Sequence, residues 1–518
     1  MRVGGGLGVK ILGVLCLVLL RPSAYLAAAE SALPLIEAVK SKDRSAVKAL
    51  LDQKTDRKVD VNAAQADGAT ALAWAAHWND LETADLLIRA GANVNAANVY
   101  GVTPLFLACR NRSAAMVTKL LEAGANPNAA LERAGETPLM TCSRTGNAEA
   151  VKALLDRGAD PAAKETWRGQ TALMWAVEQD HLEAARVLTE RGADVRAASD
   201  GGFTPLLFAA RNGNAEFAKL LLAAGADVNE STPEDGTVLV VASASGREEF
   251  SVYLLEQGAD PNTADAYGFT PLHYAMQKGI SGVSSSEDKP GYTAPPPNLP
   301  RLVKALLAHG ADPNARVAMD YPAHTRAPFR QTNPISLVGA TPFFLAAASA
   351  DAALMRTLVD GGADPNLALL DGTTALMVAA GMGRVQDFLD GEEDNVLEAV
   401  RLAVELGADV KAANRGLQTA LHAAASTGLD AVVRLLADKG ALVNAKDRVG
   451  QTPWSIAKAI SPVVNNQGAL RLHESTAELL VELGATRLTA EELISPGGLG
   501  NIRDYANVDE GAKQPARQ

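Results

Sequence analysis

The chain is 518 residues long, and its 48 basic and 60 acidic residues leave a net charge of −12. An acidic balance argues against general nucleic-acid binding, which requires a basic surface. Hydrophobic residues make up 47% of the chain and aromatic residues only 4%, a composition that suits thin, stacked helices rich in Ala and Leu.

The first 29 residues have the layout of a secretory signal peptide. Arg2 and Lys10 precede an apolar run that ends at Leu20, and three alanines at 27–29 come before Glu30. This order of basic, apolar and small residues predicts cleavage after residue 29 and export to the periplasm or outside the cell. The rest of the chain then carries a net charge of about −15, because residues 1–29 hold three basic residues and no acidic one.

An uncleaved membrane anchor is the alternative for this segment. The apolar run is short for a span, which needs about 20 apolar residues. Leu15 precedes Cys16, and a residue of that size disfavours a lipoprotein site. No other stretch is apolar enough to span a membrane, so we expect no span after signal cleavage.

From residue 33 onward the chain repeats a unit of 33 or 34 residues. In one unit, Thr204 and Pro205 predict the start of a short apolar helix, Gly213 ends it, and a second helix runs to Gly225. A pair of short helices cannot bury its apolar face alone, so a fixed period of this length predicts a stacked solenoid. The same frame begins at Thr70, Thr103, Thr137, Thr171, Thr204, Thr237, Thr270, Thr341, Thr374, Thr419 and Thr452.

The opening and closing motifs of these units resemble those of the ankyrin-repeat family. Units open with TPLFLAC at Thr103 or TPLHYAM at Thr270 and close with GANVNA at Gly91 or GADPNA at Gly310. The resemblance covers roughly residues 33–486 and implies an all-α solenoid of about 11–12 helix-turn-helix units joined by hairpin-like connections. It implies a binding protein without naming a partner, because one fold supports many functions.

The repeat frame divides the chain into six parts. Insertions that interrupt a compact array are typically functional or disordered. The parts are a signal peptide (1–29), an N-terminal capping repeat (30–69), regular repeats (70–269), repeats with insertions at 281–300, 316–339 and 386–395 (270–451), a C-terminal repeat with an insertion (452–486), and a partly disordered tail (487–518).

Cys109 and Cys142 are the cysteines that remain after signal cleavage. Export permits a disulfide, but the frame aligns Cys142 with Ala108 and Cys109 with Ser143. Stacked helices lie about 10 Å apart, beyond the roughly 7 Å that a disulfide allows between Cα atoms. We therefore expect two small buried residues that are not bonded to each other.

The sequence shows no convincing catalytic or metal-binding arrangement. It lacks the HExxH, CxxC, GxSxG and P-loop motifs. The acidic run at 390–394 lacks the spaced ligands of an EF-hand loop and is typical of a solvated charge cluster. The family resemblance assigns His273, His422 and His181 structural hydrogen bonds. We expect no enzymatic activity, no cofactor and no metal ion.

Exposed side chains along the groove are the better candidates for function. The resemblance implies that the first helix of each unit and the connection before it face a concave groove. Trp, Tyr and Arg dominate binding hot spots, and Arg110, Arg144 and Arg211 share one frame position. The candidate partner-binding residues here are Trp78, Tyr100, Arg110, Asn111, Arg144, Trp167, Arg168, Arg211 and Asn212. The alternative is that the arginines solvate the groove and the tryptophans pack on neighbouring turns, as we expect of Trp74 and Trp175.

The insertion at 316–339 is a second candidate site. Its side chains suit recognition of an anion or a peptide, and a structured loop without a binding role is the alternative. The candidate residues in it are Tyr321, His324, Arg326 and Arg330.

Together these features predict an exported scaffold that binds a protein or peptide partner through its concave face. The alternative is an enzyme, or an enzyme's accessory subunit, with a site built from the inserted loops around 316–339. A structural protein that bridges larger assemblies is a third hypothesis.

Overall fold

The computed structural model describes residues 33–52, 59–283, 297–319, 335–383, 392–460 and 472–488. The expected signal peptide, most of the insertions and the tail beyond residue 488 lie outside these ranges. The described chain divides into two compact units: the first comprises residues up to 167 together with 171–193, and the second comprises 168–170 together with the residues from 194 onward.

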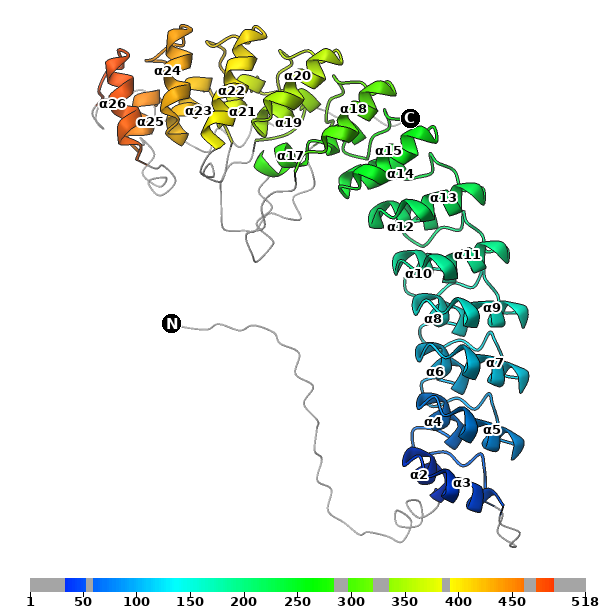
Figure 1. Ribbon diagram of the computed structural model, residues 1–518. Helices are drawn as coiled ribbons and strands as arrows, with labels where there is room; N and C mark the ends of the chain where they lie inside the picture. The colour runs from blue at the N-terminus through cyan, green and yellow to red at the C-terminus, as the bar shows by residue number, and fades with distance from the viewer. Residues whose placement is uncertain are drawn as a thin grey trace, which may run out of the picture. The chain divides into compact units, whose positions relative to one another are not determined.

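The first unit is a row of helix pairs (Figure 1). In each pair a first helix is followed by a short turn and a second helix, and the first helices of neighbouring pairs pack on one another. The pairs are α2 (Pro34–Lys40) with α3 (Arg44–Leu51), α4 (Ala71–His77) with α5 (Leu81–Arg89), α6 (Pro104–Arg110) with α7 (Ala114–Glu122), α8 (Pro138–Arg144) with α9 (Ala148–Asp156), and α10 (Ala172–Glu178) with α11 (Leu182–Glu190).

The second unit has the same architecture with additions. The short strands β1 (Ser231–Thr232) and β2 (Gly236–Thr237) form an antiparallel hairpin in one connection. Its helices are α12 (Pro205–Asn212), α13 (Ala215–Ala223), α14 (Val238–Ala244), α15 (Glu248–Glu256), α16 (Pro271–Tyr274), α17 (Gln277–Val283), α18 (Pro300–Ala308), α19 (Pro342–Ala348), α20 (Ala352–Asp360), α21 (Ala375–Ala379), α22 (Glu392–Glu405), α23 (Ala420–Thr427), α24 (Asp430–Asp438), α25 (Pro453–Ala457) and α26 (Glu474–Glu482). These paired helices confirm the predicted all-α solenoid.

The repeated threonine caps the first helix of nearly every pair. Thr70 Oγ1 accepts a hydrogen bond from the Ala73 amide at 3.3 Å, which satisfies a donor that the first helical turn leaves free. The frame predicted from the sequence therefore has a local cause. The same bond recurs at Thr103, Thr137, Thr171, Thr204, Thr237, Thr341, Thr374 and Thr452.

Histidines make a different bond at the helix start in two repeats of the second unit. His273 Nδ1 accepts a hydrogen bond from the Thr270 amide at 3.1 Å, and its Nε2 donates to the Ala340 carbonyl at 3.1 Å. His422 makes the equivalent bonds to Thr419 and to the Gln451 carbonyl. Each ring thus links its own helix start to the next repeat, which confirms the structural role predicted for both histidines.

Asparagines link the connections of successive repeats. Asn95 Nδ2 donates to the Gly124 carbonyl at 3.1 Å, and Asn95 Oδ1 accepts from the Asn126 amide at 2.7 Å. Because one side chain satisfies two backbone groups of the next repeat, it fixes the stacking inside each unit. The same pair of bonds recurs at Asn62, Asn128, Asn229, Asn262, Asn314 and Asn444.

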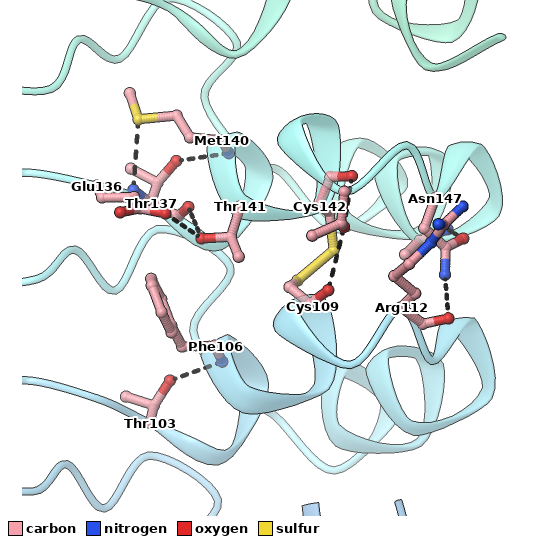
Figure 2. The surroundings of a disulfide bond; sticks show 12 residues. Thr103, Phe106, Cys109, Arg112, Glu136, Thr137, Met140, Thr141, Cys142 and Asn147 are labelled. Carbon is pink, nitrogen blue, oxygen red and sulfur yellow. Dashed lines mark hydrogen bonds between the residues drawn. A yellow bond between two sulfur atoms is a disulfide. The ribbon is translucent and has the colours of Figure 1, made fainter. Parts of the chain in front are cut away.

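A disulfide joins Cys109 at the end of α6 to Cys142 in α8, so the sequence-based expectation of two unbonded cysteines was wrong (Figure 2). Their Cα atoms lie 4.7 Å apart, and both side chains are fully buried. Hydrogen bonds support the same junction: Thr145 Oγ1 donates to the Cys109 carbonyl at 3.2 Å, and Asn147 Nδ2 donates to the Arg112 carbonyl at 2.7 Å.

The expectation was wrong because it aligned the two cysteines by frame position and used the distance between helix axes in place of the distance between their Cα atoms. Cα atoms lie about 2.3 Å from a helix axis, so Cα atoms on facing sides of two packed helices approach to about 5 Å. Cys109 and Cys142 are one frame position apart, which turns them about 100° relative to each other around their helices. The bond itself shows that Cys109 faces the following repeat and Cys142 the preceding one.

A partly buried carboxyl group in the second unit makes stability depend on pH. Thr204 Oγ1 donates a hydrogen bond to Glu230, and burial raises the pKa of that carboxyl from 4.5 to about 7. The folded state therefore favours the protonated form, and stability falls as pH rises from 4.5 to 7. We expect Glu230→Gln to stabilise the second unit by about 1–2 kcal/mol at pH 8 and by little at pH 4.5, after allowance for solvent screening.

Urea unfolding of wild type and variant at the two pH values measures this difference. Glu256→Gln is the control, because Glu256 is an exposed residue at the end of α15. A stabilisation by Glu230→Gln that is the same at both pH values would show that the buried charge is not its cause.

Candidate functional site

Basic residues end four consecutive first helices of the first unit. Lys40, His77, Arg110 and Arg144 are the final residues of α2, α4, α6 and α8, and Glu178 ends α10. We call these four residues the basic row, and we call the side lined by these five helices the first-helix face. A cation at a helix C-terminus interacts favourably with the helix dipole, so Lys40, Arg110 and Arg144 also stabilise the helices that carry them.

An aromatic cluster lies at the first two positions of the row. Trp74 and Trp78 stack with ring centroids 6.2 Å apart, and His77 meets them edge-on at 5.5 and 4.7 Å. Lys40 Nζ lies 5.3 Å from the Trp74 ring centroid, and Lys42 Nζ lies 4.8 Å from that of Trp78. These are cation–π distances. Trp78, a predicted binding residue, remains 41% exposed, whereas Trp74 is half-buried and donates to Gln65 at 2.8 Å.

Arg144 is held in place by an acid and an aromatic ring. Its guanidinium pairs with Glu136 at 3.0 Å and lies 4.7 Å from the ring centroid of Trp175. Thr141 Oγ1 donates to the same carboxylate at 2.8 Å. Trp175 Nε1 is buried without a hydrogen-bond partner among the described residues. Arg144 is thus exposed but oriented, which suits a positioned cation on this face.

Arg110 and Asn111 are adjacent in sequence but differ in their bonding. Arg110 is exposed and makes no side-chain hydrogen bond or ion pair within the described ranges. Asn111 Nδ2 donates to the Ala76 and His77 carbonyls at 3.0 and 2.6 Å, so it holds the end of α4. His181 likewise lies 2.9 Å from the Arg144 carbonyl, which confirms its predicted structural role. Contact of Asn111 with a partner stays a prediction.

The connections between pairs place further aromatic side chains in solvent. Tyr100 is 71% exposed and Trp167 is 80% exposed. Tyr100 lies one residue before Gly101 and Trp167 two residues before Gly169, and both glycines have positive φ. Val99, which the sequence reasoning missed, is also exposed beside Tyr100. The sequence could have indicated the exposure of Val99 by its position in a turn, where an apolar side chain has few residues to pack against.

The remaining candidates from the regular half lie in the second unit. Arg211 lies 5.8 and 5.3 Å from the ring centroids of Phe203 and Phe208. Asn212 is the half-buried final residue of α12, and Arg168 is exposed. The three arginines that share a frame position are therefore divided between the units: Arg110 and Arg144 belong to the first unit and Arg211 to the second.

The candidates in the insertion, Tyr321, His324, Arg326 and Arg330, lie outside the described residues. The helix α17, which leads into the insertion at 281–300, covers part of the second unit. There α17 packs on α19, with Gly279 against the Leu345 backbone, and all seven residues of α19 are buried. Lys278 Nζ pairs with Glu392 Oε1 at 2.9 Å. The chain itself therefore occupies this part of the second unit.

The described residues provide neither a metal site nor a membrane-spanning helix. Within the ranges given above, no group of three or more His, Cys, Asp and Glu side chains is arranged to hold a metal ion. Over the same ranges, every helix is too short or too polar to cross a membrane.

Comparison with known proteins identifies the repeats. The family model for ankyrin repeats (3 copies) matches residues 35–131, 129–199, 206–285 and 343–447. The solved structure of the human ASB11 ankyrin repeat domain is similar, with 29% identity over 44% of this chain and 99% of that one, at a TM-score of 0.39. That of the ankyrin repeat domain of Bcl-3, a member of the IkappaB protein family, has 31% identity over 40% of this chain and 93% of that one, at a TM-score of 0.37. The chain belongs to the ankyrin-repeat family, whose repeats generally act as protein–protein interaction modules.

Proposed function

We propose that this chain is an exported scaffold that binds a protein or peptide partner through the first-helix face of its first unit. The basic row beside the Trp74–Trp78 stack carries the proposal. Trp and Arg are the residue types that contribute most to binding hot spots. The general role of ankyrin repeats in protein–protein interaction supports a protein partner, and members of the family are typically non-catalytic, as we propose for this chain.

Export to the periplasm or outside the cell is part of this proposal. The basic, apolar and small-residue order of residues 1–29 supports it. The Cys109–Cys142 disulfide supports it independently, because disulfides persist in oxidising compartments and are rare in the cytosol.

Affinity capture from the native exported fraction tests the proposal. The bait is the chain from residue 30 onward, compared with a Lys42→Gln/Arg110→Gln variant that removes the cation over the Trp78 ring and one member of the basic row. Neither side chain has an ion-pair partner among the described residues, so the folded array should tolerate both changes. We expect the partner to be retained by wild type and reduced about tenfold or more by the variant, as for removal of two interface cations.

Two further baits with the same change in charge serve as controls. Lys48→Gln/Lys152→Gln alters exposed lysines of the second helices α3 and α9 and should keep the partner. Arg326→Gln/Arg330→Gln tests the insertion. Loss of the partner with only the insertion variant would move the site there and contradict the proposed face.

A further inference from the structure

We infer that the first-helix face of the first unit binds an extended acidic peptide segment whose carboxylates recur about every third residue. This inference rests on the proposed function and names the chemistry of the partner segment. It is drawn from the charge, the ring contacts and the spacing of the basic row.

The first argument is the excess of positive charge on this face. Glu37 pairs with Lys40 at 2.9 Å, and Glu136 pairs with Arg144 at 3.0 Å. Lys42 and Arg110 have no such acid among the described residues. On this face Lys40, Lys42, Arg110 and Arg144 outnumber Glu37, Glu136 and Glu178 by one, whereas the chain as a whole carries a net charge of −12. Charge complementarity therefore favours an acidic partner segment.

The second argument is how the aromatic rings are used. Trp74 and Trp78 stack on each other, and the ammonium groups of Lys40 and Lys42 lie over the rings. A sugar that binds by stacking needs an open ring face, and these rings are instead engaged by cations. An ammonium group held over a ring loses less freedom on binding an anion. The arrangement thus favours carboxylates over carbohydrate.

The third argument is spacing. The basic row advances by one repeat at each step, and packed helices lie about 8–10 Å apart. An extended polyproline II chain rises about 3.1 Å per residue with three residues per turn, so side chains three residues apart lie on one side about 9 Å apart and match neighbouring positions of the row. The four positions of the row, three of which carry Lys or Arg, span roughly ten residues of such a chain. The row ends at α10, whose final residue is Glu178.

Fluorescence anisotropy with labelled peptides tests the inference on the chain from residue 30 onward. The probe is a decapeptide of serine with four glutamates three residues apart. Its comparison peptides contain the same four glutamates in one block, or four lysines in place of the spaced glutamates. We expect the spaced peptide to bind about tenfold more tightly than the block peptide, to weaken at high salt, and to exceed the lysine peptide by a larger factor.

The charge-matched variants locate the binding. Lys42→Gln/Arg110→Gln should weaken the spaced peptide about tenfold, and Lys48→Gln/Lys152→Gln should change it less than about twofold. Equal binding of the spaced and block peptides, or equal losses in both variants, would overturn the inference.

Competition separates this inference from the proposed function. If the captured partner depends on Lys42 and Arg110 and the spaced peptide displaces it, both are supported. If the partner depends on these residues but the spaced peptide neither binds nor displaces it, the proposed function stands and the acidic segment is wrong. If the peptide binds with the expected dependence but no protein is captured through this face, the inference stands on peptide chemistry and the scaffold proposal fails.

Discussion

Reduction of the Cys109–Cys142 disulfide is expected to lower the free energy of unfolding of the first unit by about 3–4 kcal/mol. The bond closes a loop with a sequence separation of 33 residues, and a closed loop of this length restricts the unfolded chain considerably. It also joins α6 to α8, two repeats that would otherwise be held by packing and side-chain hydrogen bonds alone. In an array where each repeat contacts only its neighbours, weakening one junction affects the whole unit.

Urea unfolding with and without a reductant measures this effect, with the thiol content determined under each condition. A Cys109→Ala/Cys142→Ala variant should unfold at lower urea than oxidised wild type and should not respond to the reductant. This variant controls for effects of the reductant on the rest of the chain. Unchanged stability of fully reduced wild type would contradict the prediction.

Acidification is expected to destabilise the second unit through His273 and His422. Burial lowers the pKa of each histidine from 6.5 to about 4. Above pH 6.5 both rings are neutral whether the chain is folded or unfolded. Between pH 6.5 and 4 the unfolded chain binds protons that the folded chain excludes, so stability falls as pH falls, by roughly 2–3 kcal/mol per histidine.

Unfolding measured from pH 7 to pH 4 tests this dependence. A His273→Gln/His422→Gln variant should be less stable at pH 7, because it alters two buried hydrogen-bonded links, but its stability should decline less steeply with acid. His309→Gln is the control, since His309 is exposed at the end of α18. An identical pH slope in the double variant and wild type would exclude these histidines as the cause. The raised pKa of Glu230 instead makes the second unit more stable as pH falls. A variant at Glu230 therefore cannot mimic the pH dependence expected from the histidines.

Features that depend on residues within one repeat could be predicted from the sequence. The threonine caps and the two helices of each unit follow from short-range hydrogen bonds and helix periodicity. The structural role of His273 and His422 was expected from the family resemblance. The caps and helix pairs recur in nearly every repeat, so the same sequence pattern appears many times along the chain. The fold class follows from the same repetition and agrees with the family match.

Features that depend on contacts between repeats were harder to predict. The disulfide requires one cysteine to face forward and the other backward, which an alignment of equivalent positions hides. The cover that α17 places over α19 begins at Gln277, before the insertion expected at 281–300, and depends on Gly279 fitting against Leu345. Neither contact leaves a sequence pattern of its own.

The candidate site shows the same division. Its frame positions identified Arg110 and Arg144 as neighbours on one face, because they end consecutive first helices. The repeat frame could not predict that the environments of Arg110 and Arg144 differ. Arg144 is fixed by Glu136 and Trp175, whereas Arg110 has no ion pair within the described ranges. Asn111 shares the neighbourhood but is used to hold α4.

Site-specific photo-cross-linking within the capture experiment tests the central claim most directly. One bait carries a photoreactive residue at position 110, at the end of α6, and another carries it at position 152, on the second helix α9. If the first-helix face binds the partner, the partner should be cross-linked from position 110 and not from position 152. A partner that is captured by both baits but cross-linked only from position 152 would contradict the account.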